Sequence, residues 1–377
     1  MRDVARSYSI APIAAAIATA FVVITGLFLV SPARTRAASP PSMTTLATGL
    51  NNPRGLKFGP DGNLYVAEGG TGGTDSTVEQ CDQVGFPIGP YTGAFTSRIS
   101  KINAAGVVTP VVEHLPSSQT SPLSGGLVSG VADVAFIGDT LYGIEAGAGC
   151  SHGLAGTSNT VFRVNPDGSI TTIADLSAFQ TANPVANPGG PGDFEPDGTW
   201  YSMDSIGGVL YAIEPNHGEL DRILVNGQIL RVADISALQG HIVPTAFAFY
   251  QGDFFIGNLS TFPVVPGSSQ LMRMNVGGRI KNVLPGLTTV VGVAFDAKGR
   301  LYVLETDTVA GFPGPPAAGS GTVLRINEDQ SFTTIASGLV FPTAMTFGPD
   351  GALYVSNFGF GVPPVGLGQV VRIEVGQ

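Results

Sequence analysis

The chain has little charge and few of the side chains that most often carry out chemistry. Only 12% of its 377 residues are charged and the net charge is −10, whereas an average soluble protein has about 25% charged residues. An acidic balance argues against nucleic acid and anionic lipid as partners, because both attract a basic surface. There are four histidines, two cysteines and one tryptophan, and no H-E-x-x-H, G-x-S-x-G or P-loop motif occurs.

Long apolar runs are also absent, except at the N-terminus. Arg2 and Arg6 precede an uncharged, mostly apolar stretch over 10–30, and small-residue cleavage patterns follow it. This order predicts a secretory signal over 1–37. An uncleaved membrane anchor is the alternative, since the stretch is long enough to span a bilayer. In either case we expect the remainder to be extracytoplasmic, periplasmic, secreted or at the cell surface, with a short linker over 38–43 and no other membrane contact.

What the chain does have is glycine, 52 of 377 residues, and a repeated phrase. The phrase is a tight turn followed by a short apolar strand that ends in an acid or an amide. It occurs six times, as NLYVAE (63–68), TLYGIE (140–145), VLYAIE (209–214), DFFIGN (253–258), RLYVLE (300–305) and ALYVSN (352–357).

Each copy belongs to a unit of four short strands with alternating apolar and polar residues, and no long helix is expected after residue 37. Six such units predict an all-β, six-bladed β-propeller over 44–377, with a β-helix as the rival fold. The last unit stops after its third strand. Its missing outer strand is predicted at 44–50, where TTLATGL resembles SFTTIASGL near the end of the chain. Pairing of the two ends would close the ring and leave no open seam.

Loop lengths distinguish the two faces of the predicted disc. The turns after the first and third strands are short, whereas the loops after the second strands are long: 69–97, 146–157, 259–269, 306–321 and 358–368. Because function tends to lie on variable loops held by a rigid scaffold, we expect a small molecule or a partner protein to bind at this long-loop face.

The opening N-P-R-G-L-x-F-G-P-D-G-x-L-Y-V-A-E-x-G-x-G-G (52–73) resembles the exported propellers encoded with scytonemin biosynthesis, the ScyD/ScyE family. The V-x-R-x-N third strands and the Gly-rich loop around Cys81 are similar as well. More broadly, the units resemble NHL-repeat and gluconolactonase-like propellers. The resemblance implies an exported propeller and brings no established reaction.

Gluconolactonase-type enzymes hold a metal through acidic and Asn side chains at the start of the innermost strands. The positions that align here are Arg54, Ala132, Asp197, Thr245, Val291 and Thr343. Only one of them is a carboxylate, so the sequence departs from the enzyme pattern. Arg54, Asp197, Thr245 and Thr343 remain candidates for binding a polar ligand across the channel mouth.

The acid or amide that ends each second strand has two interpretations. The six side chains, Glu68, Glu145, Glu214, Asn258, Glu305 and Asn357, could supply oxygen ligands to a hard cation such as Ca²⁺. Alternatively, each caps its own loop by accepting backbone N–H bonds. We favour the cap, because a role required in every blade is usually structural.

Histidine and cysteine add further candidates on the long-loop side. His152, His217 and His241 could bind a ligand or a metal or act as a base, although isolated surface histidines are the simpler interpretation. Cys81 and Cys150 lie in equivalent loops of neighbouring blades, and in an exported chain we expect them to form a disulfide.

The sequence therefore predicts a monomeric, exported propeller that binds a small molecule or a protein at its long-loop face. Two other functions stay open. One is a metal-dependent hydrolase or lactonase at the channel mouth, and the other is a structural protein of the cell envelope. Whether the protein is an enzyme is not decided by these residues.

Overall fold

A computed structural model describes residues 42–190, 195–311, 317–359 and 366–376. The predicted signal over 1–37 lies outside the described residues, and so does most of the predicted linker. Among the residues described, no helix is long and apolar enough to cross a membrane.

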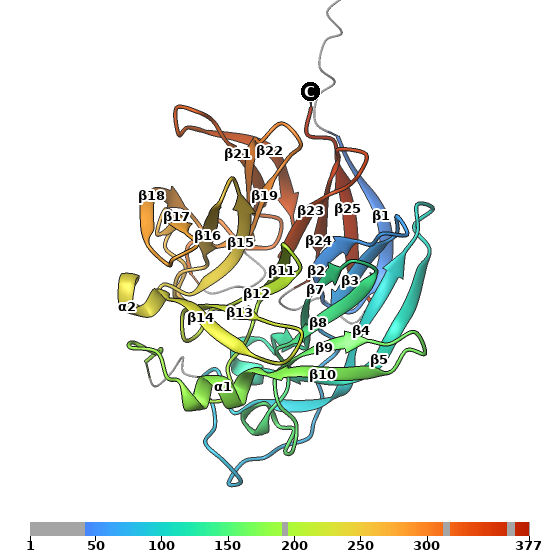
Figure 1. Cartoon of the computed structure of the whole chain (residues 1–377), viewed down its shortest axis with the longest axis vertical. Coiled ribbons are helices and arrows are strands. Elements are labelled where there is room, and N and C mark those ends of the chain that lie inside the picture. The colour runs from blue at the N-terminus through green and yellow to red at the C-terminus, as the bar shows by residue number, and fades with distance from the viewer. Residues whose placement is uncertain (1–41, 191–194, 312–316, 360–365, 377) are drawn as a thin grey trace, which may run out of the picture. The chain divides into compact units, whose positions relative to one another are not determined.

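The described chain forms six antiparallel sheets arranged around a ring, which confirms the six-bladed β-propeller (Figure 1). Blades 1 to 3 consist of β2 (Pro53–Phe58), β3 (Leu64–Glu68), β4 (Thr92–Ile102), β5 (Val108–Gln119) and a short β6 (Val128–Ser129); β7 (Val131–Ile137), β8 (Thr140–Glu145), β9 (Thr160–Val164) and β10 (Ile170–Asp175); and β11 (Ser202–Ile206), β12 (Val209–Glu214), β13 (Glu219–Ile223) and β14 (Ile229–Asp234). Blades 4 to 6 consist of β15 (Pro244–Tyr250), β16 (Asp253–Asn258), β17 (Ser269–Asn275) and β18 (Ile280–Leu287); β19 (Val290–Phe295), β20 (Leu301–Glu305), β21 (Gly321–Ile326) and β22 (Phe332–Leu339); and β23 (Ala344–Phe347), β24 (Leu353–Asn357), β25 (Gly368–Ile373) and β1 (Met43–Leu50).

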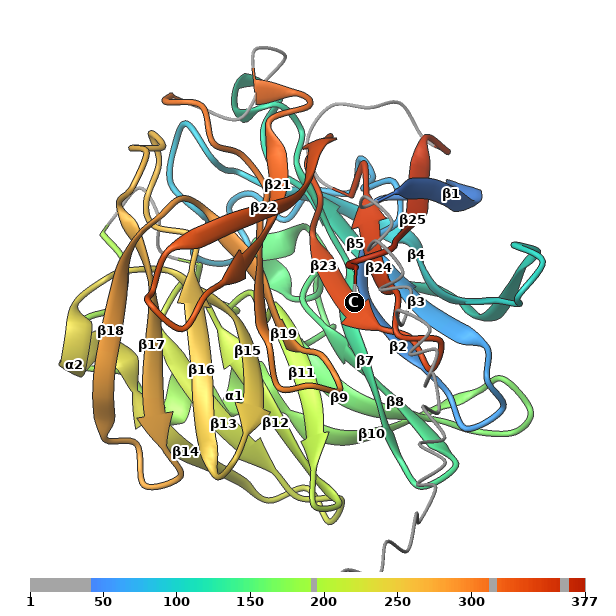
Figure 2. The ribbon, with the colours of Figure 1, turned by 90° about the horizontal axis from the view of Figure 1, so that it is seen from above.

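The two ends of the described chain close the ring, as predicted. Strand β1 pairs antiparallel with β25, with Met43 opposite Ile373 and Leu50 opposite Gly368 (Figure 2). Leu50 is fully buried there, in a cluster that also contains residues of blade 1. The N-terminal strand therefore completes blade 6 and helps to pack it against blade 1.

Local sequence explains the repeated hairpins. In the first turn, the Asp61 carboxylate accepts a hydrogen bond from the Asn63 N–H (3.1 Å), and Gly62 has a φ of 77°, which favours glycine. The strands that follow are buried on both sides because the blades pack face to face. Ile99 of blade 1, for example, shares a buried cluster with Val134 and Phe162 of blade 2.

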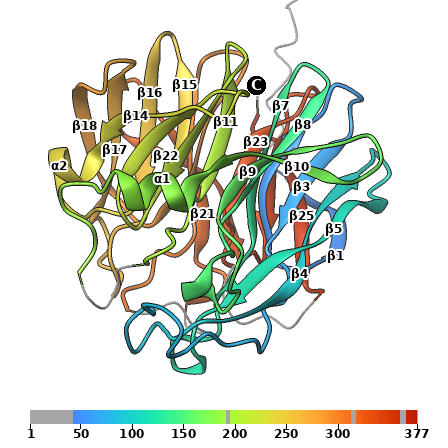
Figure 3. The ribbon, with the colours of Figure 1, turned by 60° about the horizontal axis from the view of Figure 1, so that its bottom comes forward.

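The short turns and the long loops lie on opposite faces of the disc, at the top and bottom of Figure 3. The described residues also contain short helical segments that the sequence did not predict. They are η1 (Pro122–Ser124), η2 (Cys150–His152), α1 (Leu176–Ala182) and α2 (Ile235–Gln239). Helices α1 and α2 begin because Asp175 and Asp234 accept hydrogen bonds from N–H groups of their first turns.

Candidate functional site: the central channel

The innermost strands β2, β7, β11, β15, β19 and β23 surround the channel, and their pairing with the second strands sets a common register. Two positions in that register carry the channel's polar groups. The first holds Gly55, Asp133, Ser202, Ala246, Gly292 and Ala344, and the second holds Lys57, Ala135, Asp204, Ala248, Ala294 and Thr346. At these two positions, charged residues come only from blades 1 to 3.

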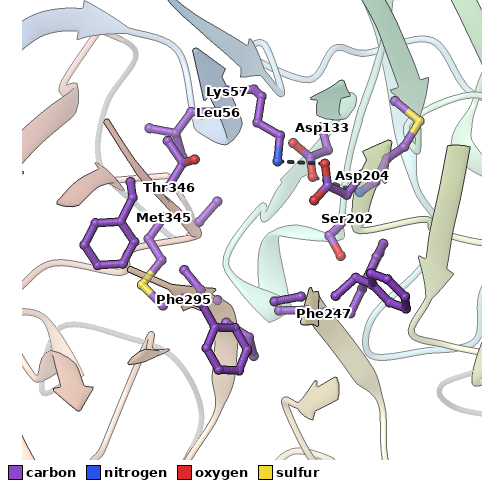
Figure 4. Close-up of a pocket in the computed structure, with 18 of the residues that line it drawn as sticks. Leu56, Lys57, Asp133, Ser202, Asp204, Phe247, Phe295, Met345 and Thr346 are labelled. Atoms are coloured by element: carbon purple, nitrogen blue, oxygen red, sulfur yellow. Dashed lines mark hydrogen bonds and ion pairs between the residues drawn. The ribbon is translucent and has the colours of Figure 1, made fainter. Parts of the chain in front are cut away.

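These strands enclose a chamber of about 520 Å³. The chamber has a polar wall with Lys57, Asp133 and Asp204, and blades 4 to 6 supply apolar side chains that include Phe247, Phe295 and Met345 (Figure 4). It extends to the residues next to the short turns, such as Tyr250. The side chains of Lys57 and Asp204 are 33% and 31% exposed, so solvent reaches the chamber. The chamber thus lies on the short-turn side, away from the face where the sequence predicted binding.

Backbone groups and one ion pair order the polar wall. The Lys57 ammonium lies 2.8 Å from the Asp204 carboxylate. The Asp133 carboxylate accepts hydrogen bonds from the N–H groups of Met203 and Val134, both at 2.8 Å. Burial raises the pKa of Asp133 to about 7, although these N–H groups and the Lys57 charge act against the rise. For Lys57, attraction to Asp204 outweighs burial and the pKa lies above its ordinary value. Lys57 is therefore charged at neutral pH, whereas Asp133 can exchange a proton there.

Tyr201 closes the chamber on the long-loop side. Its hydroxyl donates a hydrogen bond of 2.7 Å to the carbonyl of Thr343, across the channel from blade 3 to blade 6. Tyr201, Arg54 and Thr343 also line a cavity of only about 30 Å³ behind this bridge. Burial raises the pKa of Tyr201 to about 12, so the phenol keeps its proton.

One predicted inner-strand position was wrong. Tyr201, and not Asp197, occupies the aligned position in blade 3, because β11 begins only at Ser202. Asp197 lies in the preceding loop, where its carboxylate accepts hydrogen bonds from the N–H and hydroxyl of Ser151, both at 2.7 Å. None of the six aligned positions is therefore a carboxylate.

The other long-loop candidates are held in structural contacts. Thr343 donates to the carbonyl of Pro53 (2.6 Å), and Thr245 donates to that of Val290, so each links neighbouring inner strands. Arg54 donates to the carbonyl of Val128. His152 is fully buried between Ser118 and Gly198, and burial lowers its pKa to about 4.

His241 is half-buried between α2 and β15, away from the residues that line the chamber. The structure brings Arg54 and Thr343 together in the small cavity, and Asp197 and His152 around residues 151–198. It does not gather the six candidates into one site.

Cys81 and Cys150 form a disulfide, with their Cα atoms 6.3 Å apart. It links the long loop of blade 1 to that of blade 2, the pairing expected from the sequence. The disulfide borders a groove of about 490 Å³ on the long-loop face, which is also lined by Gln180, Asp197 and His217. This groove is the nearest counterpart of the predicted long-loop site.

The six acid or amide side chains are all buried and hydrogen-bonded. Most of them hold the segment that arrives from the preceding blade, which differs from the expected cap on their own loop. In five blades the side chain bonds to a backbone group of that segment. The pairs are Glu68 with Asn51, Glu214 with Thr199, Asn258 with Ile242, Glu305 with Thr288, and Asn357 with Val340. Glu145 caps its own loop, at Ala146 and Gly147, and Glu214 does both, because it also accepts the His217 N–H.

Within the described part of the chain, no three His, Cys, Asp or Glu side chains lie close enough together to hold a metal ion. Oxygen atoms of all six side chains already accept hydrogen bonds, and that of Asn258 accepts the Gln270 N–H at 2.7 Å. Glu68, for example, also pairs with the Arg98 guanidinium at 2.7 Å.

Sequence reasoning missed Lys57, Asp133, Asp204 and Tyr201. A signal for three of them was present, because they replace the Ala, Gly, Ser or Thr that other blades have at the same inner-strand positions. A charged residue that departs from its own repeat is not required by the fold. Tyr201 was missed because the unit before β11 was aligned four residues too early.

No protein-family model matches the chain, and no curated protein matches its sequence. Solved structures do match its fold. A Thermus thermophilus protein described as an oxidoreductase (glucose dehydrogenase) is 18% identical over 89% of this chain and 100% of its own, with a TM-score of 0.53. A luciferin-regenerating enzyme is 11% identical over 88% of this chain and 95% of its own, with a TM-score of 0.52. A gluconolactonase from Xanthomonas campestris is 11% identical over 89% of this chain and 90% of its own, with a TM-score of 0.51. At these identities the likeness shows the fold alone, that of a β-propeller.

Proposed function

We propose that this propeller binds a small amphipathic molecule in the central chamber and admits it from the short-turn face. The observation that supports this proposal is the division of the chamber into a charged wall from blades 1 to 3 and a mostly apolar wall from blades 4 to 6, where Asp296 is paired with Arg300. Its volume of about 520 Å³ falls within the range of about 300–1,000 Å³ that is usual for small-molecule sites.

The charged wall is costly for the fold, which is a second reason to assign it a role. Burial of the Asp133 carboxylate raises its pKa to about 7, so the ionised form is disfavoured in the folded protein. Ala, Gly, Ser or Thr at the corresponding positions of the other blades avoids that cost. Perturbed carboxyl groups that line a cavity are a common mark of functional sites.

The alternatives receive less support. A metal-dependent lactonase would need acidic or amide ligands at the start of the inner strands, where this chain has Arg54, Tyr201 and Thr343 instead. A partner protein or small molecule could still use the groove beside the disulfide, and a purely structural envelope role would leave the charged wall unexplained. The expected ScyD/ScyE relationship and an extracytoplasmic location are compatible with a binding protein and stay predictions.

A thermal-shift screen of small amphipathic molecules tests the proposal. We expect some of them to raise the melting temperature of the parent protein. Ala248→Trp places a bulky side chain in the chamber and should abolish those shifts, whereas Ala105→Trp, in an exposed turn of blade 1, should retain them. Shifts that persist in the Ala248→Trp variant would place binding elsewhere and contradict the proposal.

A further inference from the structure

The charges that line the chamber leave one carboxylate without a cation. Four charged side chains line it: Lys57, Asp133, Asp204 and Asp296. Lys57 pairs with Asp204 at 2.8 Å, and Asp296 pairs with Arg300 of its own turn. Among the described residues, none carries a positive charge within ion-pair distance of Asp133.

The backbone around Asp133 is shaped to keep its carboxylate in place. Gly55 of the neighbouring blade lies so close that a Cβ atom built on it would be 1.8 Å from Asp133 Oδ1. Any other residue at position 55 would displace the carboxylate. The two backbone N–H bonds to Asp133 use only part of its capacity, since a carboxylate can accept about four hydrogen bonds.

Apolar groups complete the description of the ligand. Blades 4 to 6 place Phe247, Phe295 and Met345 around the rest of the chamber (Figure 4), and Phe58 and Phe347 also line it. A molecule that satisfies both walls joins an ammonium group to an apolar or aromatic body.

We infer that the chamber selects organic cations, with Asp133 as the anionic anchor for a protonated amine and the apolar wall as the seat of its hydrocarbon part. This inference rests on the proposed function and specifies the class of its ligand. An organic anion is disfavoured, because it would have to take Lys57 from Asp204 and lie near two carboxylates.

Three probes of matched length test the inference: 4-phenylbutylamine, 4-phenylbutanol and 4-phenylbutyrate. At about pH 8 we expect the amine to bind at least about tenfold more tightly than the alcohol, as for a charge-assisted hydrogen bond, and the butyrate to bind most weakly. Asp133→Asn should abolish the preference for the amine. Unchanged binding of the alcohol by that variant would show that its chamber is intact.

Two further measurements distinguish binding to an anionic anchor from non-specific apolar binding. Lys57→Met removes the competing cation and frees the Asp204 carboxylate, so the variant should bind the amine more tightly than the parent protein does.

The groups that face Asp133 are Lys57 of β2 and Tyr201 and Asp204 around β11, while Arg54 lies with Tyr201 at the small cavity. With the pKa of Asp133 at about 7, amine affinity should fall by about tenfold from pH 8 to pH 6, and alcohol affinity should not change.

The outcomes distinguish this inference from the proposed function. Tightest binding of the butyrate, equal binding of amine and alcohol, or a preference that survives Asp133→Asn would overturn the cation inference. In each of those cases the proposed function would stand if Ala248→Trp still abolished binding. If none of the three probes binds the parent protein, the inference fails, and the wider screen decides the proposed function separately.

Discussion

At the scale of single residues, the repeated acid or amide is explained by the backbone that it holds. Glu305 is a clear example, because the two hydrogen bonds that hold it come from uncharged groups. One of its oxygens accepts the Thr288 N–H (2.6 Å), in the segment arriving from blade 4, and the other accepts the Thr322 hydroxyl (3.0 Å). The amide oxygen of Asn357 accepts the equivalent N–H, that of Val340, whereas Asn258 holds the incoming segment by donating its amide N–H to the Ile242 carbonyl.

Substitution of Glu305 tests whether it is a clamp or a cation ligand. Glu305→Ala leaves the buried Thr288 N–H unpaired and should lower the free energy of unfolding by about 1–3 kcal/mol, whereas Glu305→Gln should cost less than about 1 kcal/mol. Glu328→Ala, in an exposed turn of the same blade, is the control and should change stability by less than about 0.5 kcal/mol. Denaturant unfolding with added Ca²⁺ and with chelator should affect parent and Gln variant alike. A chelator effect seen in the parent alone would restore the cation-site interpretation.

At the scale of strands, the fold could be predicted because every repeat states its own pattern. The turn chemistry of Pro-Asp-Gly, the period-two strands and the likeness of 44–50 to 331–339 all point to the same closed ring. The helices α1 and α2 were missed because they have only seven and five residues, too few to show a helical repeat of apolar residues. Their starts were visible only as Asp175 and Asp234, which precede short apolar stretches.

Removal of β1 should damage the propeller far more than the loss of eleven residues, 42–52, suggests. A chain that begins at Pro53 loses the buried Leu50 and Ala47 and leaves the edge of β25 unpaired. The burial of Leu50 alone contributes about 1.5–3 kcal/mol. We expect a melting temperature lower by at least about 5 °C and a tendency to aggregate, compared with a chain that begins at Ser42. Equal melting temperatures for the two chains would contradict the role of β1 in closure.

At the scale of the whole molecule, the two faces differ in a way that loop length did not foretell. Long loops suggested the binding face, but the large chamber opens toward the short turns, and Tyr201 closes the channel on the other side. Loop length measures how much chain a face carries, not whether the channel beneath it is open. That depends on single inner-strand side chains, which vary between blades without altering the repeat.

Buried ionisable groups also give the whole molecule a defined pH dependence. Burial raises the pKa of Glu145 to about 8 and those of Glu214 and Asp133 to about 7. The folded protein therefore retains protons that the unfolded chain has lost, so stability falls as the pH rises from about 4.5 toward 8. In contrast, burial lowers the pKa values of His152 and His217 to about 4, so their contribution to stability is lost as the pH falls below about 6.5.

Because three carboxyl groups outweigh two histidines, the two effects together predict stability that falls as the pH rises above about 5, with a loss on the order of 2 kcal/mol between about pH 6.5 and pH 8.5. Glu145→Gln removes the largest contribution to that loss and should flatten the alkaline side of the curve, while Glu328→Ala should leave it unchanged. Denaturant unfolding across this range provides the measurement. Stability that rises toward pH 8.5 would show that these carboxyl groups are ionised in the folded protein at much lower pH.

Where a small molecule binds can be measured directly from the methionine methyl groups of carbon-13-labelled protein. Met203 and Met345 line the chamber, whereas Met272 and Met274 are buried in the core of blades 3 and 4 and do not line it. Addition of whichever phenylbutyl probes bind should shift the Met203 and Met345 resonances in a saturable manner and leave those of Met272 and Met274 in place. Saturable binding that moves neither Met203 nor Met345 would show that the central chamber is not the binding site.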